Sequence, residues 1–68
     1  MSREIRKFNY VNDMGYNKQL VVYLDDAEDG KYECTLWSTD TGDLCGSGRL
    51  SKDQINDLLE HYGVPERI

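Results

Sequence analysis

The triplet Asp40-Thr41-Gly42 is the part of this sequence whose residue types come nearest to a catalytic motif. In an aspartic-type hydrolase, two such loops pair across a dimer so that their carboxylates share one proton. That arrangement needs flanking hydrophobic strands and a flap, in a fold larger than 68 residues can build. Asp and Gly are also ordinary turn residues. We therefore expect a turn at this triplet rather than a protease site.

The acidic run at residues 25–30 begins like the calcium-binding loop of an EF-hand. Such a loop needs an oxygen ligand at its third position and a bidentate Glu at its twelfth. Here the third position is Ala27 and the twelfth is Leu36, so two ligands are missing. The sequence therefore does not predict a calcium site.

The other residues that could do chemistry also fall short of a site. Gly46-Ser47-Gly48 lacks the lysine and the following helix of a phosphate-binding loop. No nucleophile or base can be paired with His61, which suits the end of a helix, where positive charge is favourable. A zinc site needs about four Cys or His ligands, and the chain has only Cys34, Cys45 and His61. We predict a non-enzymatic protein without a metal or cofactor.

Acidic residues, in contrast, are numerous and unevenly placed. The chain has 13 acids against 8 Lys and Arg, a formal net charge of -5. Between residues 25 and 43, seven acids stand against one base, Lys31; they are Asp25, Asp26, Glu28, Asp29, Glu33, Asp40 and Asp43. A charge of this sign repels nucleic acid and membranes and favours basic partners. The alternative is a solvated surface that only keeps the chain soluble.

Alternating apolar residues and turn signals predict four strands in the first fifty residues. We expect them at residues 5–11, 17–24, 31–38 and 43–49, separated by turns at 12–15 and 39–42 and by an acidic loop at 25–30. Glycine, Asn and Asp in these turns supply backbone conformations that other residues adopt at a cost.

A helix follows the last strand and is marked at both ends. Ser51 and Gln54 match a capping box, and Leu50 and Ile55 flank it as a hydrophobic staple. At the other end, Gly63 suits the left-handed position after a helix, Val64 can reach back to Leu59, and Pro65 forbids continuation. Asp53, Asp57 and Glu60 fall within about 60° of one another on the outer side of this helix.

The elements together predict one α+β domain spanning residues 1–68, with a four-stranded antiparallel sheet and one C-terminal helix packed on one face (ββββα). We expect Leu44, Gly46 and Gly48 on the inner face of the sheet, where the glycines would let the helix approach closely. The predicted core consists of Leu20, Val22, Leu24, Cys34, Leu36, Ile55, Leu58, Leu59 and Tyr62.

One helix leaves the other face of the sheet open. Strand alternation assigns to it Val21, Tyr23, Thr35, Trp37 and Cys45. Tyr and Trp on such a face are favoured at interfaces, although cross-strand packing alone also uses them. Since Cys34 points inward and Cys45 outward, we expect no disulfide between them.

The sequence predicts neither a secretory signal nor a membrane span. Residues 1–6 contain no apolar segment of a secretory signal, and the longest apolar run, residues 20–24, is far shorter than a membrane span of about 20 residues. We expect a cytoplasmic chain with reduced thiols and no membrane contact.

In size, charge and architecture the whole chain resembles small acidic phage-encoded anti-CRISPR inhibitors of type I systems. The resemblance implies that the protein binds a crRNA-guided surveillance complex, a basic nucleic-acid-binding assembly, in the host cytoplasm and blocks recognition of target DNA. It implies no direct contact with nucleic acid. The basic segment at Arg3, Arg6 and Lys7 departs from a uniform DNA mimic and marks one edge as lying outside the acidic contact.

The partner-binding residues predicted from the charge map and the open face are Asp25, Asp26, Glu28, Asp29, Glu33, Asp40, Asp43, Asp53, Asp57, Glu60, Tyr23 and Trp37. The alternative function is a small protein–protein adaptor that binds through Tyr23 and Trp37. Either protein would be a monomer or a weak homodimer.

Overall fold

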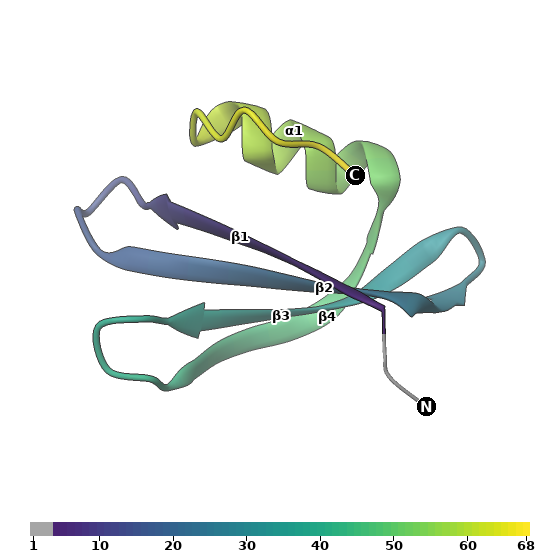
Figure 1. The fold of residues 1–68 in the computed structure, drawn as a ribbon, viewed down its shortest axis with the longest axis horizontal. Coiled ribbons are helices and arrows are strands. Elements are labelled where there is room, and N and C mark those ends of the chain that lie inside the picture. Colours follow the sequence, from purple (N-terminus) through teal and green to yellow (C-terminus); the bar gives the residue numbers. More distant parts are fainter. Residues whose placement is uncertain (1–3) are drawn as a thin grey trace.

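The computed structural model describes residues 4–68 and contains four strands followed by one helix (Figure 1). The elements are β1 (Ile5–Val11), β2 (Asn17–Glu28), β3 (Lys31–Ser38), β4 (Leu44–Ser51) and α1 (Lys52–His61). Each strand pairs antiparallel with the next, in the order β1-β2-β3-β4. The predicted ββββα fold is therefore confirmed.

The predicted acidic loop at residues 25–30 is wrong, because β2 continues to Glu28 and only Asp29 and Gly30 form the turn. Both turn residues have positive φ, 54° and 75°, as a tight two-residue hairpin turn requires. The register shifts between Tyr23, which pairs with Glu33, and Ala27, which pairs with Tyr32. Residues 24–26 are therefore extra on β2 and form a bulge, which lets the strand run on into the turn.

The core lies between α1 and one face of the sheet. Figure 1 shows α1 lying over that face, with the C-terminal segment running back along the helix. The buried cluster is Phe8, Tyr10, Leu20, Val22, Cys34, Ile55, Leu59 and Val64. Of the predicted core, Leu24, Leu36, Leu58 and Tyr62 are only partly buried but pack against this cluster. The prediction omitted Phe8 and Tyr10 of β1 and Val64, although all three are buried.

Both predicted ends of the helix are confirmed. The Ser51 side chain accepts a hydrogen bond from the Gln54 amide, and the Gln54 side chain accepts one from the Ser51 amide. At the C-terminal end, Gly63 has a φ of 72° and the Val64 amide donates to the Leu59 carbonyl at 2.9 Å, which is a Schellman motif. No helix within residues 4–68 is long and apolar enough to cross a membrane.

The predicted orientation of the first residues of β4 is wrong. Leu44 pairs with Trp37 and so belongs to the open face, where its side chain is 53% exposed. The register shift opposite Leu36 and Trp37 moves Cys45 to the helix side, where its Sγ lies 3.4 Å from Nζ of Lys18, the cross-strand partner of Tyr10. A bulge reverses strand parity, which alternation alone does not predict.

The glycines of β4 do not serve the close helix approach that we expected. Gly46 pairs with Leu36 and Gly48 pairs with Cys34, so both lie on the helix side of the sheet. A Cβ added at either position would have nothing within 4 Å. The helix therefore leaves this part of β4 uncovered.

Leu59 lies on the inner side of α1 and is fully buried. We expect Leu59→Ala to lower the free energy of unfolding by about 2–5 kcal/mol, because it removes apolar contacts and leaves a cavity. Urea unfolding followed by circular dichroism measures the change. Leu44→Ala is the matched control and should change stability by less than about 0.5 kcal/mol. Equal losses for the two variants would contradict this assignment of the core.

Both cysteines are free, with Cys34 buried and Cys45 exposed. Burial raises the pKa of the Cys34 thiol, and the charge of Glu33 raises it further, against a hydrogen bond at Leu50 that lowers it. A thiol reagent should therefore react at once with Cys45 and with Cys34 only as fast as the fold opens. Titration in denaturant without reductant should give two thiols, and a single reaction phase in the native protein would show that Cys34 is accessible.

Candidate binding surfaces

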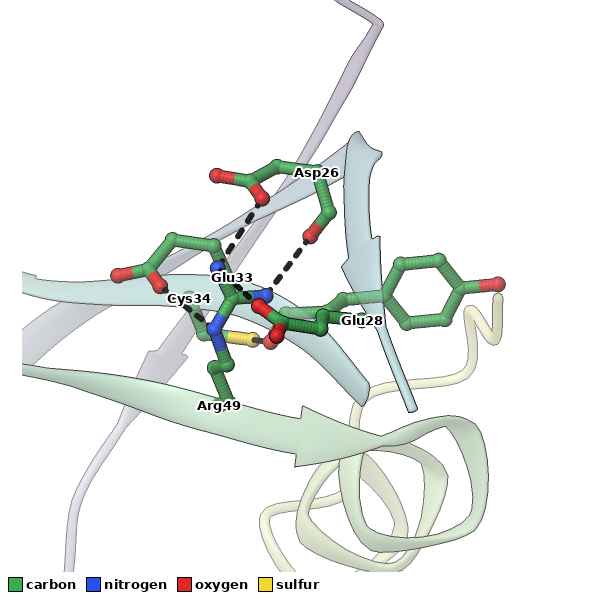
Figure 2. Close-up of polar contacts among 6 residues, drawn as sticks. Asp26, Glu28, Glu33, Cys34 and Arg49 are labelled. Atoms are coloured by element: carbon green, nitrogen blue, oxygen red, sulfur yellow. Dashed lines mark hydrogen bonds and ion pairs between the residues drawn. The ribbon is translucent and has the colours of Figure 1, made fainter. Parts of the chain in front are cut away.

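The first candidate surface is a cluster of charged residues around Arg49 (Figure 2). Its guanidinium Nη2 lies 3.1 Å from Asp26 Oδ1 and 3.9 Å from Glu28 Oε2, and its Nε lies 3.6 Å from Glu33 Oε2. Arg49 Nη1 also donates to the Asp26 carbonyl at 3.4 Å. Arg49 and Glu33 are cross-strand partners, and the bulge in β2 is what brings Asp26 to them.

Three carboxylates around one guanidinium leave an excess of negative charge. The hydrogen bond that Arg49 donates to Asp26, and the charges of Asp26, Glu33 and Glu28, raise the pKa of Arg49. Lys31 is the one base between residues 25 and 43, and Arg49 is not predicted as part of this cluster because it lies 16 to 23 residues from Asp26, Glu28 and Glu33 along the chain. The register shift in β4 sets this pairing, because the register of Trp37 with Leu44, continued without the shift, would place Gly48 opposite Glu33.

The predicted acidic residues divide between the two ends of the sheet. Lys31 pairs with Ser51, so the tip of the β2–β3 hairpin lies beside the start of α1. This end carries six of the predicted acids, Asp25, Asp26, Glu28, Asp29, Glu33 and Asp53, together with the bases Lys31, Arg49 and Lys52. Asp40 and Asp43 lie beyond the other end of β3, an eight-residue strand about 26 Å long. They do not join the acidic end.

Asp40 holds a turn together. Its carboxylate accepts hydrogen bonds from the Asn17 side chain at 2.9 Å and from the Asn17 amide at 3.2 Å. These bonds lower the pKa of Asp40. The Asp43 carbonyl accepts from the Ser38 amide, and Gly42 has a φ of 78°. The expected turn at residues 40–42 is confirmed, and the Asp40 carboxylate ties it to the start of β2.

The helix acids Asp53, Asp57 and Glu60 are all exposed, as the predicted outer stripe requires. They extend along α1 from the hairpin end toward the opposite end, where His61 Nε2 lies 4.0 Å from Asp13 Oδ1. The stripe therefore runs along the outside of the helix from the hairpin end toward Asp13.

Three basic residues lie on the β1 side of the sheet. Arg6 and Lys7 lie on β1, and Arg67 lies in the C-terminal segment. The Arg67 carbonyl accepts a hydrogen bond from Arg6 Nη2 at 3.5 Å. The Arg6 guanidinium also lies 5.3 Å from the centre of the Phe8 ring. Arg3, which we placed in the same basic segment, lies outside the described residues. Arg6, Lys7 and Arg67 lie near Glu4 and Glu66 in the chain, so the β1 side has mixed charge, whereas the hairpin end carries six acids against three bases.

The second candidate surface is the open face of the sheet. Tyr23 and Trp37 are half-buried there and share the hydroxyl of Thr35, which lies 3.5 Å from the Tyr23 hydroxyl and accepts from Trp37 Nε1 at 2.9 Å. Val21, the cross-strand partner of Thr35, is only 5% exposed although no helix covers it. The predicted face is confirmed for these four residues, and the hydroxyl contacts fix the two aromatic rings.

Within residues 4–68, no group of three or more His, Cys, Asp or Glu side chains could hold a metal ion. Neither a known protein family nor a curated protein nor a solved structure matches this chain. The geometry of the two surfaces is therefore what bears on function.

The hydrogen bonds to Asp40 predict a pH-dependent contribution to stability. A carboxyl whose pKa is lowered by folding stabilises the fold above its unfolded pKa of about 4, and the effect is lost as the pH falls through the lower folded value. Asp40→Ala should therefore destabilise the chain at pH 7, and its difference from the parent should shrink at pH 3. Urea midpoints at both pH values measure this, with Asp43→Ala as the control. A loss of equal size at pH 7 and pH 3 would contradict the role of the charged form.

Proposed function

We propose that this chain is a non-enzymatic cytoplasmic inhibitor that binds a basic nucleic-acid-binding protein complex through its acidic surface and blocks DNA recognition. The observation that carries the proposal is the excess of acids at the hairpin end, six against three bases, which Asp57 and Glu60 extend along the outside of α1. A crRNA-guided surveillance complex is the partner class that the resemblance to anti-CRISPR inhibitors implies.

The proposed mechanism is competition for the same cationic side chains. Carboxylates and DNA phosphates both bind Lys and Arg, and a protein that neutralises several phosphates binds more weakly as salt rises. An acidic surface held on a rigid sheet and helix would occupy such a groove without being a substrate. Arg49 limits this surface, since it neutralises part of the charge of Asp26, Glu28 and Glu33.

The test removes charge at the hairpin end without changing side-chain shape. The triple variant Glu28→Gln, Asp29→Asn, Asp53→Asn keeps the Arg49–Asp26 contact, and Asn tolerates the positive φ of Asp29. It should weaken inhibition of DNA binding by at least about tenfold, because several screened contacts are lost together. The readout is target-DNA binding by a panel of purified type I surveillance complexes, at low and high salt.

A matched control makes the same change of charge outside the hairpin end and the α1 stripe. It combines Asp13→Asn, Asp43→Asn and Glu66→Gln, and should inhibit nearly as well as the parent chain. If no complex in the panel loses DNA binding to the parent chain, the proposed inhibitor function is wrong. If both triple variants are equally impaired, inhibition depends on the net charge of the chain and not on the acids of the hairpin end, and the proposed binding surface is wrong.

The adaptor remains a second candidate because Thr35 fixes Tyr23 and Trp37 on an uncovered face. Fixed aromatic rings lose little entropy on binding and are typical of interface hot spots. In the same assay, Trp37→Ala should leave inhibition intact if the acidic surface binds. The adaptor would replace the inhibitor if Trp37→Ala abolished binding and the acidic triple did not.

A further inference from the structure

β4 is an edge strand of the sheet. Within the described chain it pairs with β3 alone, so its other side presents unpaired backbone groups. Natural edge strands are usually protected by charged side chains, proline or bulges. From Leu44 to Gly48, β4 carries neither charge nor proline, and its bulge lies at the Leu44 end. This edge can accept another strand.

An apolar groove of about 210 Å³ lies directly beside that edge, on the helix side of the sheet. Its lining includes Leu20, Leu36, Gly46, Gly48, Leu50 and Leu58. The two glycines expose the backbone of β4, since nothing lies within 4 Å of the positions that their Cβ atoms would take. A side chain from a neighbouring strand could therefore reach the groove over Gly46 and Gly48.

The opposite side of the same edge is acidic. Gly48 lies on the helix side, and the next residue, Arg49, lies on the open face with its cross-strand partner Glu33. There Asp26, Glu28 and Glu33 exceed Arg49 by two negative charges. Successive side chains of a strand point to opposite faces. A strand added to β4 would thus place every second residue over the apolar groove and the residues between on the side that carries Ser47, Arg49 and the three carboxylates around Arg49.

We propose that the β4 edge binds an extended segment of a basic partner, in which apolar residues alternate with Lys or Arg. Backbone hydrogen bonds would supply affinity, and the groove and the carboxylates would select the side chains, as in other cases of strand addition. The basic character of the segment rests on the proposed function. A second copy of the chain fits less well, because each copy has a net charge of -5 and would bring no excess of basic residues to these carboxylates.

The test uses the full chain, labelled with ¹⁵N, and a short end-blocked peptide of alternating valine and lysine. Saturable shifts of the backbone amides of residues 44–50 are expected on titration. Gly48→Val should weaken binding by at least about tenfold, because its side chain fills the groove. Ser47→Val is the matched control, since it adds the same side chain to the opposite face of the same strand, and its affinity should stay within about twofold of the parent.

Unfolding does not confuse this test. A Cβ at residue 48 would meet no atom within 4 Å, and β-branched residues favour strands over glycine. Gly48→Val should therefore raise the urea midpoint while it weakens peptide binding by at least about tenfold. A Gly48→Val protein that is stable and binds the peptide as well as the parent would overturn strand addition and leave the acidic surface proposal standing.

Two further outcomes separate the inference from the proposed function. A peptide with glutamine in place of lysine should bind more weakly than the lysine peptide, and raising the salt should reduce the difference. Equal binding of the two peptides would overturn the basic partner while the groove remained a strand site. No saturable shift at β4, or a parent chain that dimerises through β4, would overturn the proposal itself.

Discussion

The contact of α1 with the sheet sets the surfaces on which the rest of the molecule depends. Ile55 and Leu59 are fully buried in a cluster with Phe8 and Val22. A helix with its side chains is about 10–12 Å across, whereas four strands at about 4.8 Å spacing extend over about 14 Å between the outer strand axes alone. One helix therefore cannot cover the whole inner face. The groove over Gly46 and Gly48 follows from this limit, and the face with Trp37 is open because the single helix lies on the other side of the sheet.

The helix and the faces of the first three strands could be predicted because local interactions determine them. Ser51 and Gln54 bond to each other, Gly63 supplies the one positive φ that the helix end needs, and alternation places Leu20 and Val22 together. The two bulges could not be predicted in this way. They depend on which residues of neighbouring strands pair, and each one changes the positions of all residues beyond it.

The candidate surfaces show the same division. Exposure of the helix acids and the position of Tyr23 and Trp37 follow from periodicity. The Arg49 cluster and the separation of Asp40 from the acidic end depend on the bulge in β2 and on the length of β3. Charge counted along the sequence therefore predicted one acidic surface that is larger and more negative than the surface in the structure. Asp40 has a partner in Asn17, and the charge of Asp26 is shared with Arg49.

Gly46 and Gly48 are unusual residues for the interior of a strand. Glycine inside a strand costs about 0.5–1 kcal/mol relative to alanine, and a chain of 68 residues has a small core from which to offset that cost. Glycine in a strand usually marks a bulge, a bend or the close approach of another group. Gly46 pairs with Leu36 and so adjoins the register shift, whereas Gly48 lies two residues beyond it, has no positive φ, and no atom of the described chain lies within 4 Å of the position of its Cβ. The fold itself gives Gly48 no role, whereas a side chain from outside that must reach Leu36 and Leu58 would require the space above it to stay empty.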